Sequence, residues 1–487
     1  MKGLPNGLVL ELHPQVRVRD HGATLIGGAP LRVIHLKPAA RQHLSGTRLT
    51  ITDEASARVG SHLLATGMAG PALDLLPDPA ADDITCVIPV KDRPAGVDRL
   101  LAALGGTFPV IVVDDGSDDP DATVAVCQQH DARLVRLRHN QGPAGARNAG
   151  LAHVTTPFVL FIDSDVTIDA QDVLLLGRHL CDPRLAVIAP RVVGSLGDTG
   201  CLAAYEAARS ALDLGPHAGL VHPRSRIGWL PAACLLARVE ALDHGFDPTM
   251  RVGEDVDLVW RLIDRGWRVR YEPRVTAHHE HGRSLRQWLA RTAYYGTGGA
   301  LLVARHGTKV APAVLPPVSA AIGTAILAQR RWSAPATAAL SALMIGQLTR
   351  TLRRDPHPVV RAAELTALGY TAILGQAMSL LLRHWWPATA LAATRSRRIR
   401  RATLLAAVAD AAIDYARTRP DLDPVTFTVL RRLDDLAYGA GLWAGALRAR
   451  SAAALCPDFL SEQRHRRRGH ARDGARSGSA LDRAGAG

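Results

Sequence analysis

Two carboxylates directly follow a strongly apolar stretch of the chain, and their types and spacing suit a divalent cation. Phe158–Ile162 contains no polar residue, which is typical of a strand buried on both faces of a parallel sheet. Asp163 and Asp165 come next, at the edge where open α/β sheets bind ligands. Mg²⁺ and Mn²⁺ prefer oxygen ligands and hold their substrates through phosphate groups. These residues predict a metal site for a nucleotide diphosphate, with a solvated turn as the alternative.

The chain before this stretch predicts the elements that position the two carboxylates. Apolar segments alternate with amphipathic ones, which predicts strands over 84–90, 110–113 and 133–137 and helices over 94–104, 118–130 and 144–152. Such alternation favours a parallel sheet with right-handed crossovers. The phosphate-binding signatures GxGxxG and GxxxxGK[ST] are absent from the sequence. We therefore expect an α/β nucleotide-binding domain that holds its diphosphate through a metal.

The composition favours an anionic partner and a reducing compartment. The 487 residues are enough for two or three domains, and the formal net charge of +13 suits nucleotide phosphates, nucleic acid or an acidic membrane surface. The six cysteines include no CxxC pair, which argues against zinc and against a disulfide framework. The first residues, MKGLPNGLVL, hold no long apolar segment of a secretory signal. We expect a cytoplasmic protein.

Several motifs stand in the order and approximate spacing of a known family. They are VIPVKDRPAGVDRLLAAL, VVDDGSDD, NQGPAGARNAGL, FIDSD, GWLPAACLLARVEAL and GFDPTMRVGEDVDLVWRLIDRGWRVRYEPRVTAHHEHGRS. With these, residues 84–300 resemble the family-2 glycosyltransferases of the GT-A fold. The whole chain, including LPNGLVLELHPQVRV and RQWLARTAYYGTGGALLVARH, is similar to the glycosyltransferases of the mycofactocin system. That system builds a redox cofactor from a ribosomal peptide, and its glycosyltransferase adds glucose units.

The domain prediction follows from this resemblance and from shifts in composition. Residues 1–75 hold a hairpin-like pattern and a helix beginning near Thr52, and are expected to form a winged-helix-like α+β domain. Such a domain is similar to the elements that hold precursor peptides in ribosomal-peptide maturation, and the alternative is a structural cap. Residues 76–83 are a Pro/Asp-rich linker, and 84–305 are the GT-A catalytic domain. We expect a helical region over 306–455 and a disordered basic tail over 456–487.

The resemblance assigns the donor nucleotide to the ends of the first two predicted strands. Pro89 shapes the loop that holds the base and ribose in such folds. Asp114 and Asp115 end the second strand, and the resemblance implies that one of them accepts a hydrogen bond from a uracil N–H or a ribose hydroxyl. Asp115 alternatively caps the following helix.

The diphosphate and the metal are expected at the next strand end. Gly142 and Arg147 lie at the start of a helix, where Arg147 would pair with the diphosphate and the helix dipole would add to the attraction. A surface salt bridge is the alternative for Arg147. By resemblance, Asp165 is the direct metal ligand, and Asp163 contacts the ribose or a metal-bound water. The expected cofactor is Mn²⁺ or Mg²⁺.

The catalytic base is expected in the segment Val252–Leu262, where acids occupy the first turn of a predicted helix. An inverting transfer needs one carboxylate to take the proton from the attacking hydroxyl. Asp255 matches the family's base, and Glu254 is its competitor. Asp257 is expected to support the acceptor side of the site. The alternative for all three acids is helix capping.

Two further groups are expected at the rim of the site. His278, His279 and His281 cluster at one strand end, where similar enzymes use a histidine to reach the metal or the diphosphate. His279 fits the family spacing best, and His281 is expected near the acceptor. Trp229 either stacks on a sugar or acceptor ring or belongs to the core. Zinc is disfavoured because two aspartates ask for a harder ion.

The last third of the chain changes character. APAVLPPVSAAIGTAILA and APATAALSALMIGQL are apolar and close to the minimum length of a membrane span, and Arg-rich segments follow them. The region therefore either attaches to the cytoplasmic face of a membrane or packs as a helical bundle.

The sequence as a whole favours an inverting, metal-dependent transfer of glucose from UDP-glucose to a hydroxyl of a peptide-derived cofactor, with a short oligosaccharide as a further product. A cell-envelope polysaccharide or lipid is the alternative acceptor. A nucleic-acid-binding protein is the competing class, but the N-terminal segment lacks a dense basic patch with interleaved aromatics, so no nucleic acid is expected.

Overall fold

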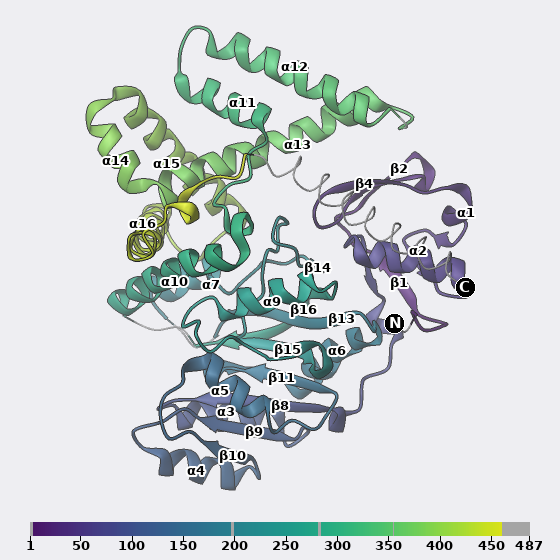
Figure 1. Cartoon of the computed structure of the whole chain (residues 1–487), viewed down its shortest axis with the longest axis vertical. Helices are drawn as coiled ribbons and strands as arrows, with labels where there is room; N and C mark the ends of the chain where they lie inside the picture. Colours follow the sequence, from purple (N-terminus) through teal and green to yellow (C-terminus); the bar gives the residue numbers. More distant parts are fainter. Residues whose placement is uncertain (1–2, 196–198, 281–283, 354, 460–487) are drawn as a thin grey trace, which may run out of the picture. The chain divides into compact units, whose positions relative to one another are not determined.

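The computed structural model describes residues 3–195, 199–280, 284–353 and 355–459 of the chain (Figure 1). The chain divides into two compact units. The first contains residues 1–291 and 417–430, and the second contains residues 292–416 and 431–487. Each unit is described by itself below.

A mixed sheet forms the centre of the first unit. Among the described residues its strands are β8 (Ile84–Val90), β9 (Val110–Asp114), β10 (Arg133–Arg136), β11 (Phe158–Ile162), β12 (Val166–Thr167), β13 (Leu185–Gly194), β14 (Gly219–Leu220), β15 (Cys234–Arg238) and β16 (Arg268–His279). They pair in the order β10-β9-β8-β11-β15-β13-β16-β12, with β14 beside β16. The first four are parallel, which confirms the predicted parallel sheet over that part. The antiparallel strand β15 then joins the parallel pair β13–β16 to it.

The helices of this unit are α3 (Pro94–Leu104), α4 (Pro120–Gln129), α5 (Gly142–Leu151), α6 (Ala170–Gly177), α7 (Cys201–Arg209), α8 (Val239–Leu242) and α9 (Glu254–Asp264), and α10 (Leu285–His306) begins in it. The predicted helix over 94–104 is confirmed, and the next two are shorter or shifted by up to two residues.

Alternate residues of each strand face different helices, as a pleated sheet requires. Cys86 and Ile88 of β8 share one core with apolar residues of α3, α4 and α6. Val87 faces the other way, against α5, where a Cβ on Gly150 would lie 2.3 Å from a Val87 methyl. Glycine at this position therefore lets α5 approach the sheet closely. As a result α5 packs closely on β8 and β9, and it begins at Gly142, beside Asp115 at the end of β9.

The N-terminal segment of the first unit is richer in strands than predicted. One sheet contains β1 (Val9–Leu12), β5 (Leu44–Ser45), β6 (Arg48–Thr50) and β7 (Ala69–Pro71), and another contains β2 (Arg17–Arg19), β3 (Thr24–Gly27) and β4 (Arg32–His35). The helices are α1 (Pro38–Arg41) and α2 (Glu54–Ala65). The predicted hairpin is the antiparallel pair β2–β3. Asp53 begins α2 with a capping box, because its carboxylate accepts from the Ser56 N–H at 2.7 Å.

Two buried arginines of β16 join this N-terminal segment to the central sheet. Arg268 donates to both carboxylate oxygens of Asp182 at 2.9 and 2.8 Å and to the Ser61 carbonyl at 3.1 Å. Arg270 donates to the Ala69 carbonyl at 2.7 Å. A buried guanidinium needs several hydrogen-bond partners, and the carbonyls of Ser61 and Ala69 supply two of them.

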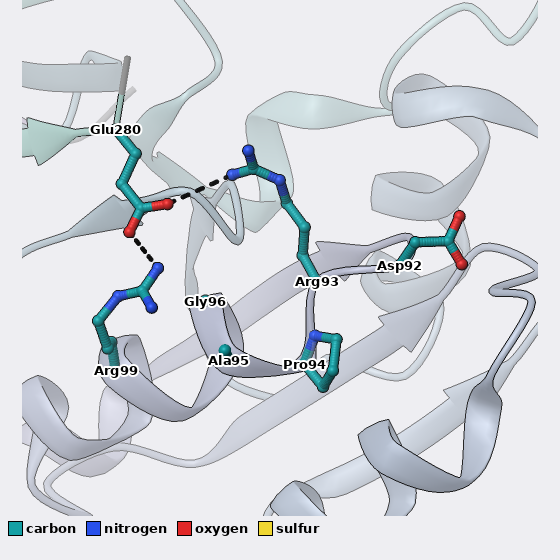
Figure 2. A pocket seen from close by; sticks show the side chains of 7 residues that line it. All are labelled: Asp92, Arg93, Pro94, Ala95, Gly96, Arg99 and Glu280. Carbon is teal, nitrogen blue, oxygen red and sulfur yellow. Dashed lines mark hydrogen bonds and ion pairs between the residues drawn. The ribbon is translucent and has the colours of Figure 1, made fainter. Parts of the chain in front are cut away.

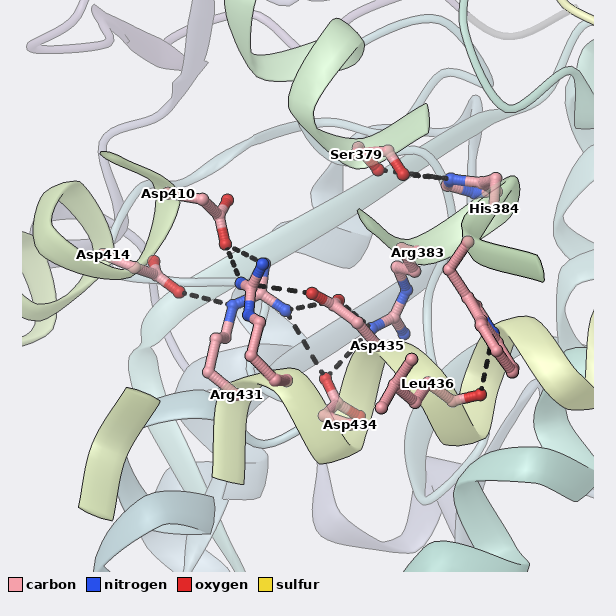
Figure 3. Close-up of polar contacts among 11 residues, drawn as sticks. Ser379, Arg383, His384, Asp410, Asp414, Arg431, Asp434, Asp435 and Leu436 are labelled. Atoms are coloured by element: carbon pink, nitrogen blue, oxygen red, sulfur yellow. Dashed lines mark hydrogen bonds and ion pairs between the residues drawn. The ribbon is translucent and has the colours of Figure 1, made fainter. Parts of the chain in front are cut away.

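The second unit is helical. Its described helices are α11 (Pro317–Ala328), α12 (Ser333–Thr351), α13 (Pro358–Ser379), which continues as a π-helical turn over Leu380–His384, α14 (Trp386–Arg395) and most of α15 (Arg397–Thr418) and α16 (Pro424–Arg448). Figure 3 shows the polar contacts that connect three of them. Asp435 of α16 is buried and accepts from Arg431 at 2.6 Å and from Arg383 at 3.1 Å, while Arg431 also reaches Asp414 of α15 at 3.1 Å.

One helical stretch among the described residues, Pro358–His384, is long and apolar enough to cross a membrane, and 22% of its apolar window is buried. The two segments singled out from the sequence differ from it. The first contains α11, which is only 12 residues long, and the second lies in α12, which does not reach the same apolar character.

We predict that Gly96→Ala destabilises the first unit. Gly96 lies on α3 against the turn after β11, and a Cβ there would be 2.1 Å from the Ser164 carbonyl oxygen. Because backbone must shift to relieve this overlap, the free energy of unfolding should fall by about 1–3 kcal/mol, measured by urea denaturation. Gly369→Ala in α13 is the matched control, since nothing lies within 4 Å of its Cβ position. Equal stability of the two variants would contradict the predicted packing.

Candidate active site

The turn after β11 holds its aspartates in a fixed backbone. The Asp163 N–H donates to the Ala233 carbonyl at 2.9 Å, and the Val166 N–H donates back to the Asp163 carbonyl at 2.9 Å. α3 supports the turn from its own side through Gly96. The aspartate side chains therefore project from a rigid edge of the sheet.

Asp165 lies between a guanidinium and an imidazole. Its Oδ2 is 3.3 Å from Arg93 Nη1 and 3.6 Å from His279 Nε2. His279 reaches this position because β12 pairs with the end of β16, with Val166 opposite His279. Burial and the charge of Asp163 raise the pKa of Asp165 to about 6. Burial and the nearby Arg291 lower the pKa of His279 to about 4, so its imidazole is neutral at pH 7.

Asp165 and His279 fit a divalent cation. A neutral imidazole and a carboxylate oxygen are both ligands of such ions, and two ligands of one ion at roughly 2.1–2.2 Å can lie up to about 4 Å apart. The 3.6 Å separation between them lies within that limit. No group of three or more His, Cys, Asp or Glu side chains with metal-site geometry occurs in the described part of the chain. Protein would thus supply few ligands, which is the usual arrangement when phosphates supply the others.

Arg147 of α5 is buried beneath the same turn and is not at the surface. Its Nη2 donates to Asp163 Oδ1 at 2.5 Å, and its Nη1 donates to Glu254 Oε1 at 3.1 Å. The guanidinium carbon also lies 5.3 Å from the centre of the Phe246 ring. The alternative of a surface salt bridge for Arg147 therefore does not hold, since only 3% of the residue is exposed.

Asp114 and Asp115, at the end of β9, accept hydrogen bonds from backbone N–H groups of neighbouring loops. Asp115 accepts from the Gln141 N–H at 2.6 Å and from the Gly142 N–H at 2.9 Å, and Asp114 accepts from the Ser117 N–H at 2.9 Å. Burial raises the pKa of Asp115. Gly142 has a φ of +78°, and a Cβ there would lie 2.6 Å from Arg251 Nη1. Pro89, half-buried in β8, pairs with Val113 one strand away.

The first turn of α9 brings two acids toward this edge and sends a third into the protein. Glu254 is bound to Arg147, as described. Asp255 is enclosed on most sides but keeps some exposed surface, and its Oδ1 accepts from the Val256 N–H at 2.7 Å. Burial and the charge of Glu254 raise its pKa to about 7. Asp257 is 1% exposed and accepts from Arg261 at 2.8 Å, which favours a supporting position over direct acceptor contact.

The loop before β15 lies beside α9. Trp229 is half-buried, which agrees with neither a fully buried core side chain nor a freely exposed one. The carbonyl of its neighbour Gly228 accepts from the Trp260 indole N–H of α9 at 2.7 Å, so this loop is tied to the helix that carries the acids. His281, predicted near the acceptor, lies outside the described residues.

The structure adds residues that sequence reasoning did not select. A cavity of about 330 Å³ is lined by Asp92, Arg93, Pro94, Ala95, Gly96, Arg99 and Glu280 (Figure 2). Glu280 forms ion pairs with both Arg93, at 3.6 Å, and Arg99. Arg93 and Arg99 lie within the first recognised motif. Arg93 follows the predicted strand and Arg99 lies on the helix after it, and these positions were the sequence signal that could have identified them. Their partner Glu280 lies near the other end of the domain sequence, between His279 and His281 of the predicted histidine cluster, and its contacts with the two arginines are long-range.

Comparisons with known proteins identify the family of the chain. The family model described as glycosyl transferase family 2 matches residues 85–217, and that described as glycosyl transferase family group 2 matches residues 158–393. A pre-mycofactocin glycosyltransferase of Mycobacterium tuberculosis is 41% identical over 472 residues, covering 94% of this chain and 98% of that protein. A poly-beta-1,6-N-acetyl-D-glucosamine synthase of Staphylococcus aureus is 26% identical over 34% of this chain and 40% of its own length.

Solved structures with a similar backbone are more distant. A mannosyltransferase from Pyrobaculum calidifontis in complex with GDP-Man and Mn²⁺ is 19% identical, covers 62% of this chain and 91% of its own, and has a TM-score of 0.36. S. aureus TarS in complex with UDP-GlcNAc is 16% identical, covers 61% and 89%, and also has a TM-score of 0.36. The assignment therefore depends on the relative that matches along almost the whole chain: the protein is a glycosyltransferase and belongs to glycosyltransferase family 2.

Proposed function

We propose that this enzyme is an inverting, divalent-metal-dependent glycosyltransferase that moves glucose from UDP-glucose to a hydroxyl of the peptide-derived precursor of mycofactocin. The observation that carries the proposal is the meeting of two acidic groups at one sheet edge: the Asp163–Asp165 turn and the Glu254–Asp255 turn, connected by Arg147. The 41% identity with a pre-mycofactocin glycosyltransferase over 94% of the chain supports this acceptor.

The donor side of the reaction needs the leaving diphosphate to be stabilised. Asp165 and His279 would hold Mn²⁺ or Mg²⁺, and the bound ion would offset the negative charge that develops on the departing UDP. Asp163 lies on the same turn and is fixed by Arg147, so it is available to orient the ribose or a water ligand. Asp115 holds the loop before α5, and with it the wall on which the nucleotide would lie.

The acceptor side needs a base. The acceptor oxygen forms a bond to the anomeric carbon while the bond from that carbon to the diphosphate oxygen breaks, and the hydroxyl proton passes to Asp255. Burial favours this role, because a carboxylate whose pKa is raised to about 7 binds a proton more strongly than an ordinary aspartate. Trp229, on the loop tied to α9, would stack on the aromatic or sugar ring of an acceptor.

We predict that the purified protein adds one or more hexoses to the peptide-derived acceptor when it is given UDP-glucose and Mn²⁺ or Mg²⁺. Mass spectrometry of the acceptor measures the gain. Asp165→Ala and Asp255→Ala should each lower turnover by at least about 10²-fold, because one removes a metal ligand and the other the base. Arg191→Lys, in a surface-side pair with Asp213, serves as a matched control.

Each other outcome has a distinct meaning. Release of UDP without hexose on the acceptor would support UDP-glucose as the donor and contradict the proposed acceptor. A cell-envelope polysaccharide or lipid would then be tested as the acceptor. Equal activity after exhaustive chelation with EDTA would contradict the metal site. Absence of both binding and turnover of nucleotide sugars would overturn the proposal.

The rate should depend on pH through Asp255. A base must be deprotonated to accept the acceptor proton, so a pKa of about 7 predicts that kcat falls about tenfold per pH unit below pH 7 and reaches a plateau above it. The measurement is kcat against pH at saturating donor and metal. A plateau that extends down to pH 5 would show that the group acting as base has an ordinary carboxylate pKa.

The second unit suggests attachment to a membrane surface as an additional property. α15 exposes Leu404, Leu405 and Val408 at 62%, 59% and 67% of their surface. The same helix begins with the exposed arginines Arg397, Arg398, Arg400 and Arg401. Apolar side chains beside a basic cluster favour binding to anionic lipid.

We therefore predict that the protein sediments with vesicles containing phosphatidylglycerol and much less with vesicles of phosphatidylcholine alone. Replacing the four arginines at the start of α15 by glutamine should lower binding at least about tenfold, because each basic residue near the surface adds roughly 1 kcal/mol. The same four-residue change should leave glucose transfer to a soluble acceptor unaffected. Equal binding of wild type and variant, or no binding to either vesicle, would contradict this attachment.

A further inference from the structure

Arg147 is almost fully buried and is held by groups of the protein itself. It lies on α5, which packs closely on the sheet at Gly150, and only 3% of its surface is exposed. Its guanidinium lies over the Phe246 ring, with 5.3 Å between the Cζ atom and the ring centre. Both faces of the group are therefore enclosed by protein, and its position is set by the fold.

The two outer nitrogens of this guanidinium contact separate parts of the site. Nη2 binds Asp163 at 2.5 Å, two residues before Asp165, and Nη1 binds Glu254 at 3.1 Å, immediately before Asp255. The two carboxylates belong to elements that are 91 residues apart in sequence, on the turn after β11 and in the first turn of α9. The planar guanidinium thus sets the direction and the distance of both carboxylates, those of Asp163 and Glu254.

We propose that Arg147 is a positioning residue that fixes the turn carrying Asp165 relative to the turn carrying Asp255, and that it does not bind the donor diphosphate itself. This inference rests on the proposed function for the roles of Asp165 and Asp255. It also assigns Glu254: its carboxylate holds Arg147, which leaves Asp255 as the acid that receives the proton. The sequence-based expectation that Arg147 pairs with the diphosphate is replaced by this role.

A positioning role and a diphosphate-binding role differ in what their loss changes. A side chain that binds the diphosphate strengthens donor binding, so its loss weakens nucleotide affinity. A side chain that sets the distance between donor and base acts on the chemical step, where a misplacement of about 1 Å can lower the rate about 10²-fold. The two roles therefore separate in kcat and in the dissociation constant of the metal–UDP complex.

The test is Arg147→Lys, which keeps the positive charge but replaces a two-armed planar donor by a single point charge. We expect kcat to fall at least about tenfold while the dissociation constant of UDP with Mn²⁺, measured by calorimetry, changes less than about threefold. Arg268→Lys is the matched control, because Arg268 is an equally buried arginine that binds both oxygens of Asp182 away from the site. Its kcat per folded molecule should equal that of wild type.

Glu254→Gln provides an independent measurement should Arg147→Lys fail to fold. It weakens one arm of the bridge and leaves Arg147 in place, so kcat should fall with nucleotide affinity retained, but far less than in Asp255→Asn. The double variant Arg147→Lys/Glu254→Gln should be little worse than Arg147→Lys alone, because both changes break one connection.

Three results would overturn the inference. They are a rise of more than tenfold in the UDP dissociation constant with kcat unchanged, full activity of Glu254→Gln, and loss of activity in Glu254→Gln equal to that of Asp255→Asn. If wild type does not use UDP-glucose, the proposed function fails but this test remains, because the same variants can be compared on whichever nucleotide sugar wild type hydrolyses or transfers, by release of the nucleoside diphosphate.

Discussion

Asp163, Asp165, Glu254 and Asp255 bring four carboxylates to one edge of a sheet, where each of them is partly or almost fully buried. Like charges in such a place repel strongly, and burial adds to this effect by raising the pKa values of Asp165 and Asp255. The raised pKa values of Asp165 and Asp255, about 6 and about 7, are the trace of this repulsion and burial. Arg147 offsets part of it from below, and Arg93 offsets part of it from the side of Asp165.

The surrounding fold can be understood as support for that charge balance. α5 carries Arg147 and approaches the sheet because Gly150 leaves room for it. α3 carries Arg93 at its start and Gly96 against the Ser164 carbonyl. β15 pairs with β11 and supplies, just before it, the Ala233 carbonyl that holds the Asp163 N–H. Each element therefore contributes both packing and a polar contact to the same edge.

Sequence reasoning predicted the strands and helices of this edge but not the long-range contacts between their side chains. β8, α3 and β11 follow from local apolar patterns, because their hydrophobic runs and their proline and glycine boundaries lie within a few residues. The burial of Arg147 does not follow from local pattern, since its partner Glu254 is 107 residues away and an arginine near a helix start has the same appearance at a surface. The contact of Arg93 with Asp165 and the pairing of Val166 with His279 are likewise long-range. Family resemblance supplied the expected roles of Asp165, His279 and Asp255, which local sequence patterns do not indicate.

β16 connects the candidate site with the N-terminal segment. Its last residue is His279, beside Asp165, and its first residues include Arg268 and Arg270, whose guanidinium groups bind carbonyls of Ser61 and Ala69 in the N-terminal segment. Cutting the chain before Ile84 would remove those carbonyls, so Arg268 would keep only Asp182 of these partners and Arg270 would lose its contact with Ala69. For protein engineering, the smallest dependable catalytic fragment therefore includes the N-terminal sheets, and a fusion partner or affinity tag belongs ahead of them and not at the Pro/Asp-rich connection.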